Sequence, residues 1–194
     1  FHSARWDDSA VLDDARVGVV GCGSTGIQIV NALSSRSSHV VHLSRSPQWI
    51  MPVPQFDYTD EQKAAFASDD SAINAVRRDP DYWASIYRFT DGVTDSNSPE
   101  IAEIEAICRQ YLEDKIKDPD LLEKMRPNYQ AACKRLIYNW EYYDNIQKPN
   151  VFVETGGIER IEPEGVRMKD GTLHELDVLV LATGFQAGMF IRPA

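Results

Sequence analysis

The sequence predicts an α/β fold, a doubly wound parallel sheet with a helical insertion, on three observations. Valine- and leucine-rich runs lie near both ends, at 16–20 and 177–182. A glycine-rich turn at 21–26 follows the first run and opens a stretch with helical periodicity. Between the two runs, residues 57–126 are mostly helical in pattern. A strand, glycine turn, helix and second strand within about 30 residues form a βαβ unit, which requires parallel strands.

The first βαβ unit can be placed element by element. Residues 16–20 fit a buried strand, because they are almost entirely apolar. The residues that give the following helix one apolar face are Ile27, Ile29, Val30, Ala32 and Leu33. The serine-rich segment 34–38 ends this helix, and 39–43 is the second predicted strand.

The helical insertion follows a proline-rich segment, 46–55, which we expect to be irregular because proline lacks an amide donor. Helices are expected to start after residues typical of N-caps, which are Thr59, Ser98 and Asp118. In the helix after Ser98, the predicted buried stripe consists of Ile101, Ile104, Cys108, Tyr111 and Leu112.

The period returns to that of strands beyond Asn150. Short strands are predicted at 151–154, 158–161 and 165–168, and Asp170 with Gly171 is typical of a hairpin turn. The last strand, 177–182, is almost continuously apolar, as a parallel strand covered on both faces should be. We therefore divide the chain into a junction segment, 1–14, and one domain, 15–194, with the insertion at about 57–126.

Composition limits the class of protein. The 194 residues are 43% apolar and 26% charged, and no apolar run reaches the roughly 20 residues of a membrane-spanning helix. The net charge of −10 argues against nucleic-acid binding. Three cysteines far apart form no CxxC metal site and no disulfide framework, so we expect no metal and a cytoplasmic protein without membrane contact.

Charge is distributed unevenly along the chain. Residues 16–56 contain three arginines and neither Asp nor Glu, which favours an anionic ligand in this segment. The chain also begins at Phe1 rather than Met. We therefore expect a fragment of a longer protein.

The turn at 21–26 has the GxGxxG spacing of a Rossmann-like dinucleotide site. Gly21 permits the tight turn, Gly23 lets a pyrophosphate approach the backbone, and Gly26 lets the helix pack on the strand. Free amides at the helix start, with the hydroxyls of Ser24 and Thr25, favour the anion. The alternative is a purely structural turn.

The end of the second strand indicates which nucleotide binds. An Asp or Glu there would accept a hydrogen bond from an adenosine ribose, but the chain has Arg45 and Ser46 instead. A guanidinium and a hydroxyl suit a 2′-phosphate, so the sequence favours NADP(H) over NAD(H) or FAD. The alternative for Arg45 is a solvated surface arginine.

Taken together, these residues resemble the Baeyer–Villiger monooxygenases over nearly the whole chain. Residues 2–7, HSARWD, are similar to the second half of that family's FxGxxxHxxxW(P/D) fingerprint, and the GCGSTG turn follows at the usual place. The resemblance continues through 45–49, 133–135 and 177–185. The Trp6 and Asp7 ending favours this group over N-hydroxylating relatives.

The resemblance implies roles for individual residues. The pyrophosphate would lie against Gly21, Gly23, Ser24, Thr25 and Gly26, with Gln28 nearby on the same helix. Arg45, Ser46 and Lys134 would meet the 2′-phosphate, and Thr183 and Gly184 would complete the cofactor site. Arg135 matches the family's catalytic arginine, a cation that would oppose developing negative charge. His2 and Trp6 would lie at a domain junction, with a hinge role.

The same resemblance implies the reaction. Such enzymes use NADPH, FAD and O2 to oxidise ketones to esters or lactones. No second glycine fingerprint is present, so FAD would be bound by a domain of the parent chain that is missing here, and this chain alone would bind only NADPH.

Other interpretations remain open. Lys134 and Arg135 could be ordinary surface cations. The protein could be an N- or S-hydroxylating flavin-containing monooxygenase, or a non-catalytic NADP-binding module. A flavin-free dehydrogenase lacks support, because no Tyr and Lys pair has the short-chain dehydrogenase spacing.

Overall fold

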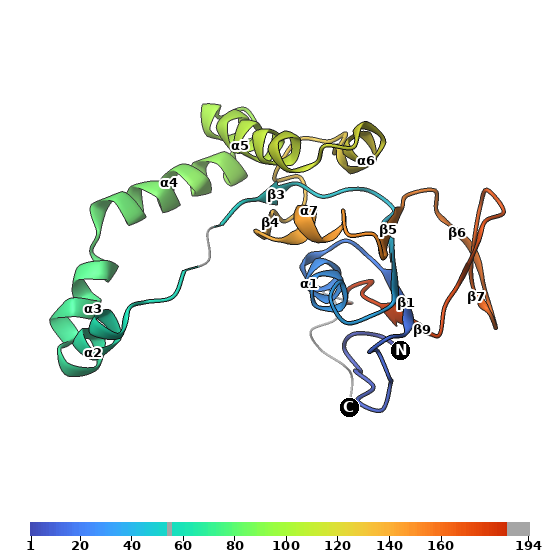
Figure 1. Cartoon of the computed structure of the whole chain (residues 1–194). Coiled ribbons are helices and arrows are strands. Elements are labelled where there is room, and N and C mark those ends of the chain that lie inside the picture. The colour runs from blue at the N-terminus through green and yellow to red at the C-terminus, as the bar shows by residue number, and fades with distance from the viewer. Residues whose placement is uncertain (54–55, 186–194) are drawn as a thin grey trace, which may run out of the picture.

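The computed structural model describes residues 1–53 and 56–185 (Figure 1). The elements, in chain order, are β1 (Arg16–Val20), α1 (Ser24–Leu33), β2 (His39–Leu43), β3 (Ile50–Met51), α2 (Asp60–Ser68), α3 (Asp70–Arg77), α4 (Pro80–Thr94), α5 (Pro99–Lys115), α6 (Pro119–Met125), β4 (Ile137–Tyr138), α7 (Tyr142–Asn145), β5 (Val151–Glu154), β6 (Ile158–Glu162), β7 (Gly165–Met168), β8 (Leu173–Glu175) and β9 (Val178–Leu181).

Four parallel strands form the central sheet in the order β5-β2-β1-β9. The register aligns the carboxyl ends of the strands, with Val20 beside Leu43 and Leu181, and Leu43 beside Glu154. The predicted α/β class with a parallel sheet is confirmed. The first residues extend this sheet, because His2 bridges to Leu181 on the free edge of β9.

The two faces of the sheet have different cover. Alternate residues of β1, Val17 and Val19, pack with Ile27 and Val30 of α1 in one core. On the other face, Val41 and Leu43 of β2 form a second core with one side of an antiparallel sheet, β6-β7-β8. The other buried members of this core are Val166 and Met168 of β7, and Leu176, which directly follows β8. Figure 1 shows α1 and this antiparallel sheet on opposite sides of β1. Strands, rather than helices, therefore cover the second face.

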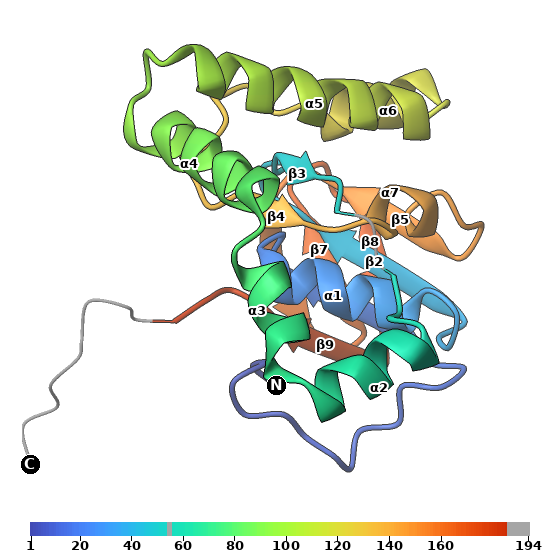
Figure 2. The same cartoon turned by 90° about the vertical axis from the view of Figure 1, so that its left-hand side faces the viewer.

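The insertion is helical, as predicted, and its helices start where the capping residues indicate. The Thr59 hydroxyl accepts from the amide of Gln62, the Ser98 hydroxyl from Ile101, and the Asp118 carboxylate from Leu121. The predicted stripe of α5 is buried as a whole. Figures 1 and 2 show α5 lying over β3 and β4 and α6 lying over α7 and β5, while α2, α3 and α4 extend away from the parallel sheet.

The proline-rich segment is less irregular than predicted. Ile50 and Met51, between Pro47 and Pro52, keep both amide donors and form β3, which pairs in parallel with β4. The amide of Ile137 donates to the carbonyl of Trp49 at 3.2 Å. This pairing brings the chain around residue 134 next to the end of β2, 88 residues earlier.

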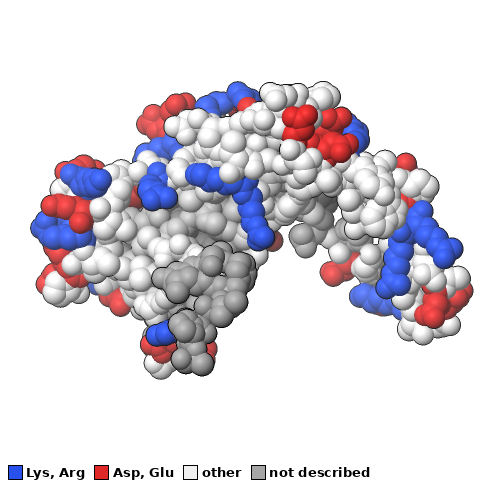
Figure 3. All heavy atoms as spheres, turned by 180° about the vertical axis from the view of Figure 1, so that it is seen from behind, with Lys and Arg blue, Asp and Glu red and all other residues white. Residues whose placement is uncertain are grey.

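Charged side chains of both signs share the surface of the protein. Over the described residues of the face in Figure 3, Lys and Arg side chains are interspersed with Asp and Glu side chains, so the acidic excess is not gathered into one area there. No helix among residues 1–53 and 56–185 combines the length and the apolar character needed to cross a bilayer.

Candidate functional site

A cavity of about 630 Å³ opens at the carboxyl ends of β1, β2 and β9. In α/β sheets, ligands bind at this edge. The residues with side chains or backbone on its wall include Gly21, Cys22, Gly23, Leu43, Ser44, Arg45, Ser46, Gln48, Lys134, Glu154, Met168, Lys169, Thr183 and Gly184. Seven of the predicted cofactor residues therefore line one cavity, although they come from four separate segments.

The three glycines of the turn are needed for different reasons. Gly21 has φ +114°, and a Cβ there would lie 2.3 Å from the carbonyl oxygen of Ala182. A Cβ on Gly26 would lie 1.9 Å from the carbonyl oxygen of Gly21, so α1 packs directly on the turn. A Cβ on Gly23 would meet no atom within 4 Å. The fold thus requires Gly21 and Gly26, whereas Gly23 keeps open space at the cavity wall.

The N-terminus of α1 is suited to an anion. Its N-cap is Gly23, which makes no side-chain capping bond, and the first turn contains no acidic residue. The first amides of a helix have no partner within it, and the helix dipole is positive at this end. Ser24, Thr25 and Gln28 are exposed at or near this end but are not on the cavity wall, whereas Gly26 is buried.

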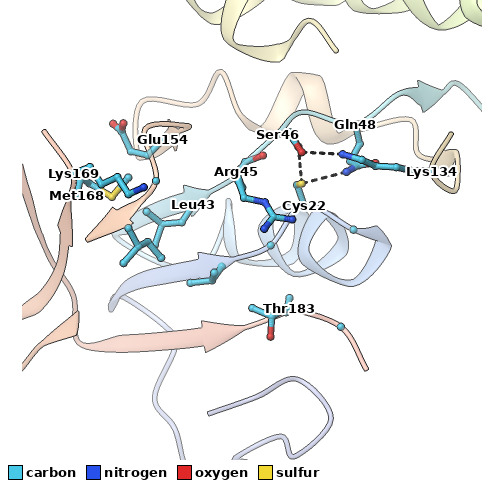
Figure 4. A pocket seen from close by; sticks show the side chains of 18 residues that line it. Cys22, Leu43, Arg45, Ser46, Gln48, Lys134, Glu154, Met168, Lys169 and Thr183 are labelled. Carbon is cyan, nitrogen blue, oxygen red and sulfur yellow. Dashed lines mark hydrogen bonds between the residues drawn. The ribbon is translucent and has the colours of Figure 1, made fainter. Parts of the chain in front are cut away.

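Two cations lie at the end of β2. Figure 4 shows Arg45 and Lys134 on the same side of the cavity as Ser46. The Lys134 ammonium donates to the Ser46 hydroxyl at 3.0 Å and lies 4.2 Å from the centre of the Tyr129 ring. These two contacts fix the position of a side chain that would otherwise be mobile in solvent. Arg45, Ser46 and Lys134 therefore line the same part of the cavity, and their binding of a 2′-phosphate stays a prediction.

The opposite side of the cavity has residues that sequence reasoning missed. Figure 4 places Glu154 close to Lys169 and Met168, away from Ser46 and Lys134. Glu154 ends β5 and Lys169 follows β7, and no motif marks either residue in the sequence. The only carboxylate on the described wall is thus separated from the Ser46 and Lys134 pair.

A thiol links the glycine turn to the loop after β2. The Cys22 thiol donates to the carbonyl of Ser46 at 2.9 Å and accepts from the Gln48 amide at 3.5 Å. The Tyr129 hydroxyl donates to the carbonyl of Pro47, in the same loop, at 3.0 Å. Gln48 was part of the family resemblance without a role, and here it holds two segments of the wall together.

The remaining predicted residues are placed differently. Thr183 and Gly184 lie on the cavity wall after β9. His2 donates from Nε2 to the Gly184 carbonyl at 3.1 Å, while its Nδ1 accepts from the amide of Ala4 at 3.0 Å. Arg135 is exposed, is not on the cavity wall, and has no ion-pair partner among residues 1–53 and 56–185. Its catalytic role stays a prediction.

A buried histidine lies beneath the turn. His42 of β2 is fully buried, and its Nε2 is 2.9 Å from the Gly21 carbonyl oxygen. Its Nδ1 is 2.8 Å from the Tyr142 hydroxyl. Burial lowers the pKa of His42 to about 4, so the ring is neutral at neutral pH. A carbonyl only accepts, so Nε2 carries the proton and Tyr142 donates to Nδ1.

This burial predicts a pH dependence of stability. Between pH 6.5 and 4, His42 binds a proton in the unfolded chain but not in the folded one, so stability falls as pH falls. The loss reaches about 3 kcal/mol below pH 4. Urea melts from pH 7 to pH 4 should show it, and His42→Gln should lack this component. Identical pH profiles of the two proteins would contradict the assignment.

The chain is similar to known proteins over all or nearly all of its length. A monooxygenase of Mycobacterium tuberculosis, described as uncharacterized, is 35% identical over 100% of the chain. A Baeyer–Villiger monooxygenase of Streptomyces coelicolor is 31% identical over 95% of the chain. The cyclohexanone monooxygenase of Rhodococcus sp. Phi1, solved with NADP+ bound, matches 95% of the chain with a TM-score of 0.77 and 30% identity. The chain is a relative of the Baeyer–Villiger monooxygenases.

The chain corresponds to less than half of the length of each of these monooxygenases. The chain spans 38% and 35% of the two curated relatives and 41% of the cyclohexanone monooxygenase. No protein-family model matches the chain. The resemblance predicted from residues 2–7, the glycine turn and the later segments is confirmed, and so is the parallel-sheet fold of these enzymes.

Proposed function

We propose that the chain is the NADPH-binding part of an FAD-dependent Baeyer–Villiger monooxygenase, which oxidises ketones to esters or lactones with O2. The hydrogen bond from Lys134 to Ser46 supports this most directly, because it sets a second cation beside Arg45 at the end of β2. That is where a 2′-phosphate would lie in a dinucleotide site. FAD would be bound by a part of the relatives' length that this chain does not span.

The wall of the cavity fits the dinucleotide. Open space at Gly23 and the uncapped start of α1 suit the pyrophosphate, and Arg45, Ser46 and Lys134 suit the 2′-phosphate. When bound, NADPH supplies the reducing equivalents for the flavin. The chain's own residues bind and orient the cofactor, and Arg135 would oppose negative charge that develops during ketone oxidation.

The first experiment is a calorimetric titration of the chain with NADPH and, separately, with NADH. We expect NADPH to bind at least about tenfold more tightly, since only NADPH carries the 2′-phosphate that the cations can pair with. Equal affinity for the two nucleotides would contradict the cofactor assignment. Binding of neither would favour a structural role for the glycine turn.

Arg135 is tested in the longer protein supplied with FAD, NADPH and a panel of ketones. Arg135→Ala should lower the rate of ester or lactone formation by about a hundredfold, because a positioned cation is lost at the reacting centre. The same substitution in this chain should leave the Kd for NADPH within about twofold, because Arg135 is off the cavity wall.

The reaction itself separates the remaining alternatives. Conversion of amines or thioethers, with no ester or lactone from any ketone, would favour an N- or S-hydroxylating monooxygenase. Unchanged turnover of ketones by Arg135→Ala would show that Arg135 is a surface cation.

A further inference from the structure

The glycine turn is attached to the sheet through a buried chain of polar groups that cofactor contact alone does not explain. The Gly21 carbonyl accepts from His42, which accepts from the Tyr142 hydroxyl. The two rings meet edge to face, with centres 5.7 Å apart. Both side chains are at most 1% exposed. The neighbouring residues on this face of the sheet, such as Val40 and Val153, are apolar.

The position of Tyr142 is itself fixed by hydrogen bonds. The Asn139 side-chain oxygen accepts from the amides of Glu141 and Tyr142, at 3.0 and 2.8 Å. The same oxygen accepts from the side-chain Nδ2 of Asn31 on α1 at 3.1 Å. The segment that begins at Lys134 and continues to Tyr142 is thereby connected to the underside of the glycine turn.

We propose that His42 is a positioning residue for the proposed NADPH site, because it donates from Nε2 to the Gly21 carbonyl, and that Tyr142 holds the His42 ring in place by donating to Nδ1. Because a carbonyl oxygen only accepts, the proton of the neutral ring is on Nε2 and points at the turn, and the Tyr142 hydroxyl donates to Nδ1. Gly21 has a positive φ, and the hydrogen bond that its carbonyl accepts from His42 helps to hold this conformation. The positioning role of His42 rests on the proposed function only for the expected change in NADPH affinity. The expected change in hydrogen exchange does not depend on it.

The decisive variant is His42→Phe, because it removes the donor to the Gly21 carbonyl and keeps an aromatic ring at the buried position. In His42→Phe we expect amide hydrogen exchange at residues 21–26 to become about tenfold faster, and the Kd for NADPH to rise about tenfold. Tyr142→Phe keeps the bond from Nε2 to the carbonyl and removes only the bond to Nδ1, so it should give a smaller change in the same direction. His42→Gln should restore slow exchange, because its amide can donate in the place of Nε2.

A matched control is Val41→Ala, on the same strand but facing the antiparallel sheet. It removes buried apolar volume, so it should lower the melting temperature without selectively accelerating exchange at residues 21–26. Comparison with this variant separates loss of packing from loss of positioning.

Hydrogen exchange at residues 21–26 in the variants tests the role of His42 directly. Unchanged exchange at the turn in folded His42→Phe would overturn the role of His42, and so would exchange in His42→Gln as fast as in His42→Phe. Faster exchange without any NADPH binding by the wild-type chain would leave the positioning role standing and contradict the proposed function instead.

Discussion

Gly23→Ala is expected to abolish measurable NADPH binding while the chain stays folded. The backbone of Gly23, at φ −74° and ψ 179°, is accessible to alanine, and the added Cβ would meet no protein atom within 4 Å. The methyl group would instead occupy the space through which a pyrophosphate approaches the start of α1. Circular dichroism melts should show an unchanged or slightly higher melting temperature, and calorimetry should detect no binding.

The neighbouring glycines provide the controls. Gly26→Ala would place a Cβ 1.9 Å from the Gly21 carbonyl oxygen, and Gly21→Ala would combine a positive φ with a 2.3 Å approach to Ala182. Each should lower the free energy of unfolding by about 3 kcal/mol or more. If Gly23→Ala bound NADPH as tightly as the wild-type chain, the turn would not be the pyrophosphate site.

The elements that the sequence predicts correctly are those set by local chemistry. Thr59, Ser98 and Asp118 each cap a helix through a bond to the residue three positions later, so the signal is local. The buried stripe of α5 follows from helical spacing alone. Such features need no knowledge of where the rest of the chain lies.

The features that the sequence does not predict depend on contacts between distant segments. The strands from Ile158 to Glu175 are visible as strands, but their docking against Val41 and Leu43 is a property of the tertiary fold. The pairing of β3 with β4 could not be predicted, because β3 has only two residues and lies between Pro47 and Pro52. It brings Lys134 to Ser46, a convergence that the family resemblance implied and that spacing alone could not give.

His42 illustrates the same limit inside the site. In the sequence it is one of two histidines in an otherwise apolar strand, and its two partners lie 21 and 100 residues away. Glu154 and Lys169 likewise reach the cavity from strands whose order in the sheets is not encoded locally. Motifs therefore identified residues on the side of the cavity proposed to bind phosphate, and tertiary structure was needed to find those on the opposite side.

The double substitution Arg45→Ala and Lys134→Ala should weaken NADPH binding by about a thousandfold and leave NADH binding nearly unchanged. Each cation can make a charge-assisted hydrogen bond to a 2′-phosphate, and such bonds contribute roughly 1.5–3 kcal/mol apiece. Lys134 is already held by Ser46 and by the Tyr129 ring, so little side-chain entropy is lost on binding. Calorimetry with both nucleotides measures the change in preference.

Lys169 is the matched control for charge. It lies on the wall of the same cavity, but on the side of Glu154 and away from Ser46. Lys169→Ala removes the same charge as Lys134→Ala, so any effect of general electrostatic attraction is common to both variants. A loss confined to Lys134→Ala and to NADPH locates the 2′-phosphate at the end of β2. Equal losses in the two variants would mean that the cavity attracts anions without distinguishing the two nucleotides.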